Sequence, residues 1–421
     1  MSQLFDPLLH FIRKQAGSKK TPILFSDESK KMFKTLYEKI KQAETEWIRE
    51  GYRSVKSKSG LITKTGKTIS KTIGHRYIPL EIRDFLDSTN THFWESNYNF
   101  NANGRHYSII MVLPRTSAMT KDKIGHFFEN ALHKIYLWLS VIDSIAYSHC
   151  GQNVKIYLYF TDFLKLLPDT RGHSLDWIHS NTAFTSSCIP SADIVIFRKE
   201  EWFKVFIHET FHTMGLDFSD MMPHIHKRGD QELCHIFPHL KNVKELRIYE
   251  SYNETWAELI NVLFIAHFTT QYENKPPHFD TVFQKMERMV YYEAHHSLFQ
   301  CAKILHHYKL TYAEIIDLYP SKIKPYTENT HIFAYYVVKA ILMFQAEGFI
   351  QWCLKHNTEN VLQFNKTDQN IFAFCHLIKR LYNTPEFLES IHRAETIFSD
   401  EEKQKIPQNV AKTLRMSLFD M

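Results

Sequence analysis

The chain has 421 residues, of which 44% are hydrophobic and 23% are charged, and its 51 Lys and Arg exceed its 46 Asp and Glu to give a formal charge of +5. This composition, with only 12 Gly and 14 Pro, excludes intrinsically disordered and collagen-like chains and is typical of a globular protein with two or three domains. The 25 His are numerous, and they favour metal or acid–base chemistry.

The cysteines and the apolar segments bear on the compartment. Six cysteines are scattered without a C-x-x-C pair: Cys150, Cys188, Cys234, Cys301, Cys353 and Cys375. Such a pattern does not indicate a disulfide framework, and it favours a reducing compartment. Met1–Lys14 has charges within its apolar run and no small-residue cleavage site, so we do not predict a signal peptide. Because no apolar window reaches the ~20 residues of a spanning helix, we expect an intracellular, cytoplasmic protein without a membrane span.

The first elements are a helix and a basic stretch. Asp27–Glu50 has its apolar residues on one stripe and is predicted to be helical. Gly51–Leu80 has no acidic residue and alternates around three glycines, which suits a hairpin or an exposed ribbon and is also compatible with a mobile loop. Its seven positive charges are Arg53, Lys56, Lys58, Lys64, Lys67, Lys71 and Arg76.

The middle of the chain is rich in predicted strands, and the remainder is helical. Strands are expected at Tyr107–Leu113, Val154–Phe160, Asn181–Cys188 and Asp193–Phe197, with a helix at Lys121–Tyr147. Later helices are expected at Asp280–His307, Ile332–Phe344, Asp368–Tyr382 and Pro385–Phe398. A capping box formed by Thr311 and Glu314 is expected to begin another helix. We therefore predict an α+β fold with an N-terminal extension (1–100), an α/β subdomain (101–216) and a helical subdomain (217–421).

One short segment carries most of the chemical information. In Arg198–Asp217 the apolar residues recur at helical spacing, so the pentad His208-Glu209-Thr210-Phe211-His212 is predicted to lie on a helix. His208 and His212 are then one turn apart on one face, and both imidazoles can reach a single metal ion. Glu209 is rotated by ~100° and can face a metal-bound water. Gly215 is expected to end the helix.

A third metal ligand is expected downstream. In the H-E-x-x-H-x-x-G-x-x-H class the third ligand would stand at position 218, which is Phe218 here. The run Asn253-Glu254-Thr255-Trp256-Ala257 instead resembles the N-E-G-F-A helix of metal-dependent aminopeptidases and, more loosely, the N-E-A-x-x-D helix of thermolysin-like enzymes. The chain thus resembles the gluzincin class of zincin metallopeptidases. That resemblance implies a small mixed sheet packed on the active-site helix, zinc bound by His208, His212 and Glu254, and a second-shell Glu258 that accepts from a ligand histidine.

Two further features extend the resemblance. The interval from His212 to Glu254 is long, and the insertion Asp217–Arg247 is expected to form a loop excursion that contains His224, His226, His235 and His239. Asn181–Phe184 resembles the edge strand with which thermolysin-like enzymes pair their peptide substrate, although an ordinary strand fits the same residues. The two motifs together also look like uncharacterised zincin-like proteins of large nucleocytoplasmic DNA viruses, which implies host cytoplasm or a virion as the location.

The expected activity is zinc-dependent hydrolysis of peptide bonds in a protein or peptide substrate, with Glu209 as general base. The oxyanion donor is left open among Tyr252, Tyr249 and a histidine of the insertion. An alternative is a catalytically degenerate zincin-fold binding protein, in which the basic stretch 51–80 contacts nucleic acid or another anionic partner.

Overall fold

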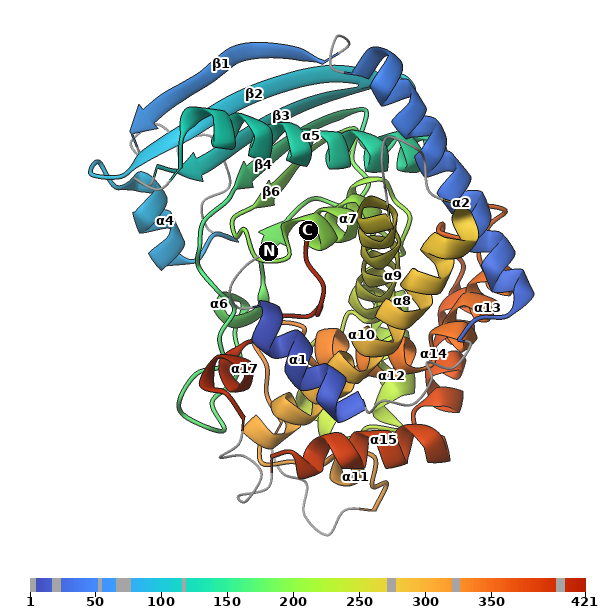
Figure 1. The fold of residues 1–421 in the computed structure, drawn as a ribbon. Coiled ribbons are helices and arrows are strands. Elements are labelled where there is room, and N and C mark those ends of the chain that lie inside the picture. Colours follow the sequence, from blue (N-terminus) through green and yellow to red (C-terminus); the bar gives the residue numbers. More distant parts are fainter. Residues whose placement is uncertain are drawn as a thin grey trace. The chain divides into compact units, whose positions relative to one another are not determined.

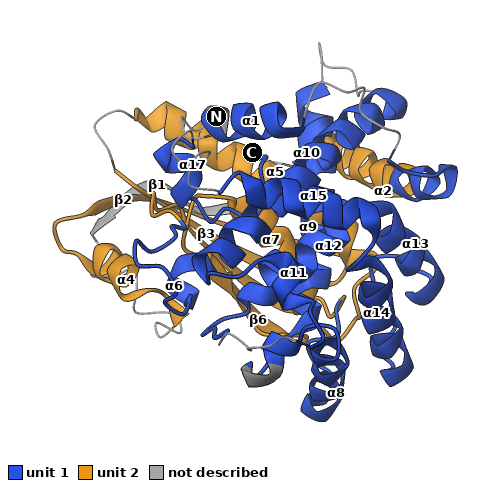
Figure 2. Cartoon of the chain, turned by 90° about the horizontal axis from the view of Figure 1, so that it is seen from below, with its two compact units in different colours: residues 1–33, 165–180, 217–421 blue, residues 34–164, 181–216 orange. Residues whose placement is uncertain are grey.

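The computed structural model describes residues 5–16, 24–51, 55–65, 77–115, 119–270, 278–319, 326–398 and 406–421. The chain divides into two compact units (Figure 2). Unit 1 comprises residues 1–33, 165–180 and 217–421, and unit 2 comprises residues 34–164 and 181–216. This division differs from the predicted one, because residues 1–100 are shared between the two units, whereas the predicted boundary after residue 216 coincides with an observed boundary.

Unit 2 contains a six-stranded mixed sheet with the strand order β1-β2-β3-β4-β6-β5 (Figure 1). The strands are β1 (Lys56–Thr65), β2 (His92–Ala102), β3 (Arg105–Pro114), β4 (Asn153–Tyr159), β5 (Ala183–Phe184) and β6 (Ser191–Ile196). β1, β2 and β3 are antiparallel neighbours, β3, β4 and β6 are parallel neighbours, and β5 runs antiparallel to β6 at the edge. With the helices of both units, this sheet confirms the predicted α+β class.

The hairpin of β2 and β3 was only half predicted. Ala102 pairs with Arg105 across a two-residue turn, in which Asn103 and Gly104 both have positive φ, as a type I′ turn requires. β2 escaped prediction because it is rich in Asn and buries the polar side chains of Glu95 and Ser96, so its apolar alternation is interrupted. The strand is held by its pairing with β1 and β3 instead.

Both faces of the sheet carry buried side chains. Ile82 and Leu86 of α4 (Leu80–Asp87) pack in one cluster with Phe93, Val112, Tyr157, Tyr159 and Val195 from four strands. The alternate residues Ile156 and Leu158 point to the opposite face and are also buried. α5 (Lys121–Asp143) contacts β2, and α7 (Trp202–Thr213) contacts β6, β5 and α5. The predicted helix that carries the pentad is therefore packed on the sheet.

Unit 1 is helical, as expected for the end of the chain. Its helices are α1 (Phe5–Ala16), α6 (Trp177–Ser180), α8 (Pro223–Cys234), α9 (Ile248–Thr270), α10 (Phe279–His307), α11 (Tyr312–Ile315), α12 (Lys339–Phe344), α13 (Ala346–His356), α14 (Asp368–Leu381), α15 (Pro385–Thr396) and α17 (Gln408–Lys412). α10 contacts α9, α12, α15 and α1, and it is the central helix of this unit. The capping box of Thr311 and Glu314 is present at the start of α11.

Two segments differ from the prediction. The insertion 217–247 was expected to be a loop, but it contains α8 and the 3₁₀ turn η5 (Pro238–Asn242), because Pro223 opens a helix whose Ile225 and Leu233 are buried. The strand expected at Asn181–Cys188 is shorter in the structure, where it is β5. Cys188, the last residue of the predicted strand, has a left-handed backbone with a φ of 44°.

The helix expected at Ile332–Phe344 begins as a π-helical segment, η6 (Phe333–Val338), and continues as α12. Among the described residues, no single helix is long and apolar enough to cross a membrane. One pair of helices in the described part of the chain is long and apolar enough when its members are taken together. The pair consists of Phe333–Phe344 and Ala346–His356, which meet at a bend of 91°.

Candidate metal centre

α7 places the predicted pentad on a buried helix of unit 2. The indole Nε1 of Trp138 on α5 donates to Thr210 Oγ1 at 2.7 Å, and the Trp138 ring stacks on Phe211. The helix ends at Gly215, which has a φ of +68° and whose N–H donates to the carbonyl of His212. The helix and its glycine end were both predicted from the sequence and are confirmed.

The two histidines of the pentad lie on one face of α7. Their Nε2 atoms are 3.2 Å apart, and the exposed fractions of His208 and His212 are 4% and 7%. Two nitrogen ligands at 2.0–2.1 Å from one tetrahedral ion are separated by roughly 3.3 Å. The pair therefore has the spacing that a single metal ion requires of two imidazole ligands.

Glu209 lies on the same helix and is also buried. Its carbonyl oxygen accepts a hydrogen bond from Thr213 Oγ1 at 3.0 Å, so the backbone at this position is held in regular helix. As the residue after His208, it is rotated by ~100° from the ligand face. Its side chain therefore leaves the helix in a different direction from the two imidazoles.

The remaining predicted site residues belong to unit 1. Glu254, Glu258 and Tyr252 are on α9, whose side chains are buried from Ile248 to His267. Glu254 has an exposed fraction of 3%, and Glu250 is buried one turn before it on the same face. The predicted site residues are accordingly divided between a helix of each unit.

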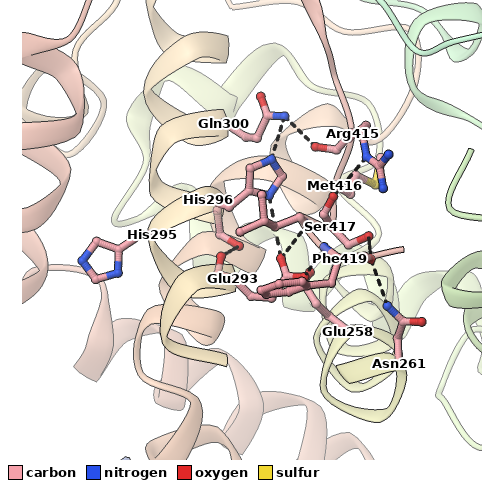
Figure 3. A network of polar contacts seen from close by, with 12 residues as sticks. Glu258, Asn261, Glu293, His295, His296, Gln300, Arg415, Met416, Ser417 and Phe419 are labelled. Atoms are coloured by element: carbon pink, nitrogen blue, oxygen red, sulfur yellow. Dashed lines mark hydrogen bonds and ion pairs between the residues drawn. The ribbon is translucent and has the colours of Figure 1, made fainter. Parts of the chain in front are cut away.

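Glu258 has partners inside unit 1. Its carboxylate forms an ion pair with the Lys339 ammonium on α12. Both residues lie beside Glu293 on α10. The carboxylate of Glu293, which Figure 3 shows together with Glu258 and Phe419, accepts hydrogen bonds from the N–H groups of Leu418 and Phe419. Burial raises the pKa of Glu258 well above its usual range, while Lys339 opposes that shift. The predicted bond of Glu258 to a ligand histidine stays a prediction, and the structure supplies a different role for this carboxylate.

Tyr252, the predicted oxyanion donor, is fully buried on α9. Its hydroxyl donates to the carbonyl of Leu362 at 3.2 Å and accepts from Asn357 Nδ2 at 2.7 Å. Burial raises its pKa well above the usual value. Donation to an oxyanion would require the hydroxyl to give up its bond to Leu362.

Part of the predicted basic stretch is a strand. Lys56–Thr65 forms β1 at the edge of the sheet and pairs with β2, which agrees with the ribbon alternative. Residues 52–54 and 66–76, which include Arg53, Lys67, Lys71 and Arg76, lie outside the described residues.

Sequence reasoning missed a second group of ligand atoms in unit 2. Cys150 and Cys188 form a disulfide, and His149 Nε2 lies 3.4 Å from Cys188 Sγ. The two cysteines are 38 residues apart and have no motif around them, so no sequence signal pointed to the pair. Among the described residues, the other four cysteines are not in disulfides.

Comparison with known proteins adds no relative. No family model, no curated protein and no solved structure matches the chain.

Proposed function

We propose that the protein is a zinc-dependent metallopeptidase of the zincin type. The observation that carries the proposal is the buried His208–His212 pair, whose Nε2 atoms have the separation of two ligands of one tetrahedral ion. Two buried imidazoles with their nitrogens directed at one another need a proton or a cation between them. We infer a zinc ion, because the two histidines of an H-E-x-x-H helix are typical zinc ligands. Glu209 is the glutamate of this pattern, which acts as the general base.

The third ligand in this proposal is Glu254, and Glu250 is the other acid of α9 that could take the role. Both are buried carboxylates on one helical face, where two such charges repel unless a cation lies near them. Bound zinc would supply a Lewis acid that makes water a nucleophile near neutral pH. Glu209 would take the proton of that water on a carboxylate oxygen and pass it to the leaving amine.

Elemental analysis of the purified, oxidised protein tests the metal. We expect about one equivalent of zinc per chain, which is lost in His208→Ala and in His212→Ala. His126→Ala is the matched control, because His126 is an exposed histidine of unit 2 whose loss should leave the zinc content unchanged. Less than about a tenth of an equivalent in the wild type after zinc-replete expression would contradict the proposal.

A peptide-library digest tests the reaction. Zinc-loaded wild type should cleave, whereas chelated protein and Glu209→Gln should not. Equal cleavage by all three samples would identify a contaminating protease. Absence of cleavage by zinc-loaded wild type would favour the degenerate binding protein, and salt-dependent binding to nucleic acid through residues 51–80 would then be the property to measure.

A further inference from the structure

Unit 2 contains a cluster of one imidazole and two sulfurs outside the proposed metal centre. One ligand atom each from His149, Cys150 and Cys188 lie within 4.8 Å of one another. His149 is exposed, Cys188 is half-buried and Cys150 is buried, so the cluster opens to solvent on the histidine side. Thiolate and imidazole are the ligands that zinc prefers in structural sites.

The cluster is built against the end of α7. The N–H of Cys188 donates to the carbonyl of His212 at 3.0 Å. A Cβ atom added at Gly215 would lie 2.9 Å from Cys150 Sγ and 3.1 Å from Cys188 Sγ, so both sulfurs are in contact with the glycine that ends the helix. Cys188 itself has a left-handed backbone, with a φ of 44°.

The state of the sulfurs depends on the surroundings. A disulfide persists in an oxidising compartment, whereas thiol reductants open it in a reducing one. After reduction, the thiols of Cys150 and Cys188 and the imidazole of His149 are three potential metal ligands close together.

We propose that, when the disulfide is reduced, His149, Cys150 and Cys188 bind one thiophilic divalent cation, with zinc as the expected ion. An external dithiol supplies the two electrons and two protons that convert the disulfide to two thiols, and it leaves as a cyclic disulfide. Binding releases one proton from each thiol, and the two thiolates and the His149 imidazole leave a fourth position for water. The sulfurs separate to roughly 3.8 Å as ligands of one tetrahedral ion. The exposed His149 ring and the half-buried Cys188 side chain supply the required movement.

This second site does not depend on the proposed peptidase centre, because it shares no ligand with it. Its occupancy would hold the end of α7 in the reduced protein, as the disulfide does in the oxidised protein. The cation would therefore stabilise the end of α7.

Zinc content and cobalt spectroscopy of the full-length protein test the proposal. Reduction with a dithiol, followed by removal of the reductant without air, should raise the zinc content by about one equivalent over the oxidised protein. Cobalt added to the reduced protein should give a near-ultraviolet thiolate-to-cobalt charge-transfer band. That band requires a sulfur ligand, and His208, His212 and Glu254 cannot produce it.

Variants assign the band. Cys188→Ser should abolish it, whereas Cys234→Ser, which removes a partly exposed cysteine of unit 1 that is not in a disulfide, should leave it unchanged. His149→Ala should keep the fold, because His149 is exposed, and should weaken zinc binding to the reduced protein by at least about 10-fold. Reduced wild type that gains neither zinc nor the band overturns the proposal, and so does a band that survives Cys188→Ser.

The His208→Ala/His212→Ala double variant separates this proposal from the peptidase. The oxidised form of this variant should contain no zinc, and its reduced form should still bind about one equivalent of zinc. If the oxidised wild type holds zinc and reduction adds none, the result would support the peptidase centre and contradict the second site.

Discussion

The backbone N–H of Cys188 donates to the carbonyl oxygen of His212 at 3.0 Å. The last turn of α7, which contains one of the two paired histidines, is therefore bonded to a cysteine that is itself covalently linked to Cys150. Gly215 fills the remaining space between the helix end and the two sulfurs. The position of His212 thus depends on residues outside the proposed peptidase centre.

Gly215→Ala should destabilise unit 2 more than Gly104→Ala. Both glycines have positive φ, so both substitutions carry a backbone cost of about 1 kcal/mol. Only at Gly215 does the new methyl group meet two sulfur atoms, which should add about 1–3 kcal/mol, whereas nothing lies within 4 Å at Gly104. Urea unfolding of the two variants measures the difference, and equal losses would show that the sulfur contacts are unimportant.

Glu209→Gln separates an enzyme from a scaffold. Glutamine keeps the size and the hydrogen-bonding capacity of the side chain but cannot accept the proton of water. Zinc content and melting temperature should therefore be unchanged, while peptide hydrolysis falls by ~10²-fold or more. A variant with normal turnover would exclude Glu209 as the base, and one with reduced zinc content would give it a structural role.

Glu258→Gln should lower the stability of unit 1 and leave zinc binding intact. The substitution leaves the Lys339 ammonium buried without its closest carboxylate, which should lower the free energy of unfolding by about 3 kcal/mol. The Glu258→Leu/Lys339→Met double variant removes both charges and should recover much of that loss. If zinc affinity instead falls by about 10- to 100-fold while unfolding is unchanged, Glu258 accepts a hydrogen bond from a ligand histidine, as the resemblance implies.

The stability of unit 2 should fall between about pH 4 and pH 7 because of Asp143. Burial raises the pKa of Asp143 to about 7, although the Tyr107 hydroxyl and the Arg105 guanidinium favour its charged form. In that window the folded protein holds a proton that the unfolded chain has released, so raising the pH removes up to about 4 kcal/mol of stability, with little further change above the folded pKa.

Urea unfolding of the wild type and Asp143→Asn at several pH values measures this contribution. The amide cannot ionise, so the difference in stability between the two proteins should shrink or change sign as the pH rises to 7. A wild type that gains stability relative to Asp143→Asn over this range would show that Arg105 and Tyr107 outweigh burial.

The elements that the sequence predicts well are those with regular apolar periodicity. The period of two in β3 and β4 and the helical period in α7 and α10 predicted those elements close to their observed bounds. β2 was missed because buried Glu95 and Ser96 break its pattern, and α8 was missed because most of its residues are polar. The apolar pattern of a segment predicts its secondary structure only where the apolar residues are also the ones that are buried.

The candidate site shows the same limit. The spacing of His208 and His212 is local to one helical turn, so its geometry was predictable. The pairing of Cys150 with Cys188 and of Glu258 with Lys339 joins segments distant in sequence, and no local pattern indicates which residue is the partner of Cys150 or of Glu258. Such contacts depend on the tertiary fold, and a single sequence does not encode them in any local pattern.

The segmental make-up of the two units has a consequence for synthesis. Every residue of unit 2 has been translated once position 216 has left the ribosome, so its sheet and the His208–His212 helix can form early. Unit 1 cannot be completed until much later, because Glu293 on its central helix is bonded to the backbone of Leu418 and Phe419. Residues 1–33 and 165–180, although made early, must therefore wait for partners from the last part of the chain. Interrupted translation products that end between the two stages should contain a folded sheet attached to exposed apolar helices, and those fragments should be the main substrates for chaperones and quality-control proteases.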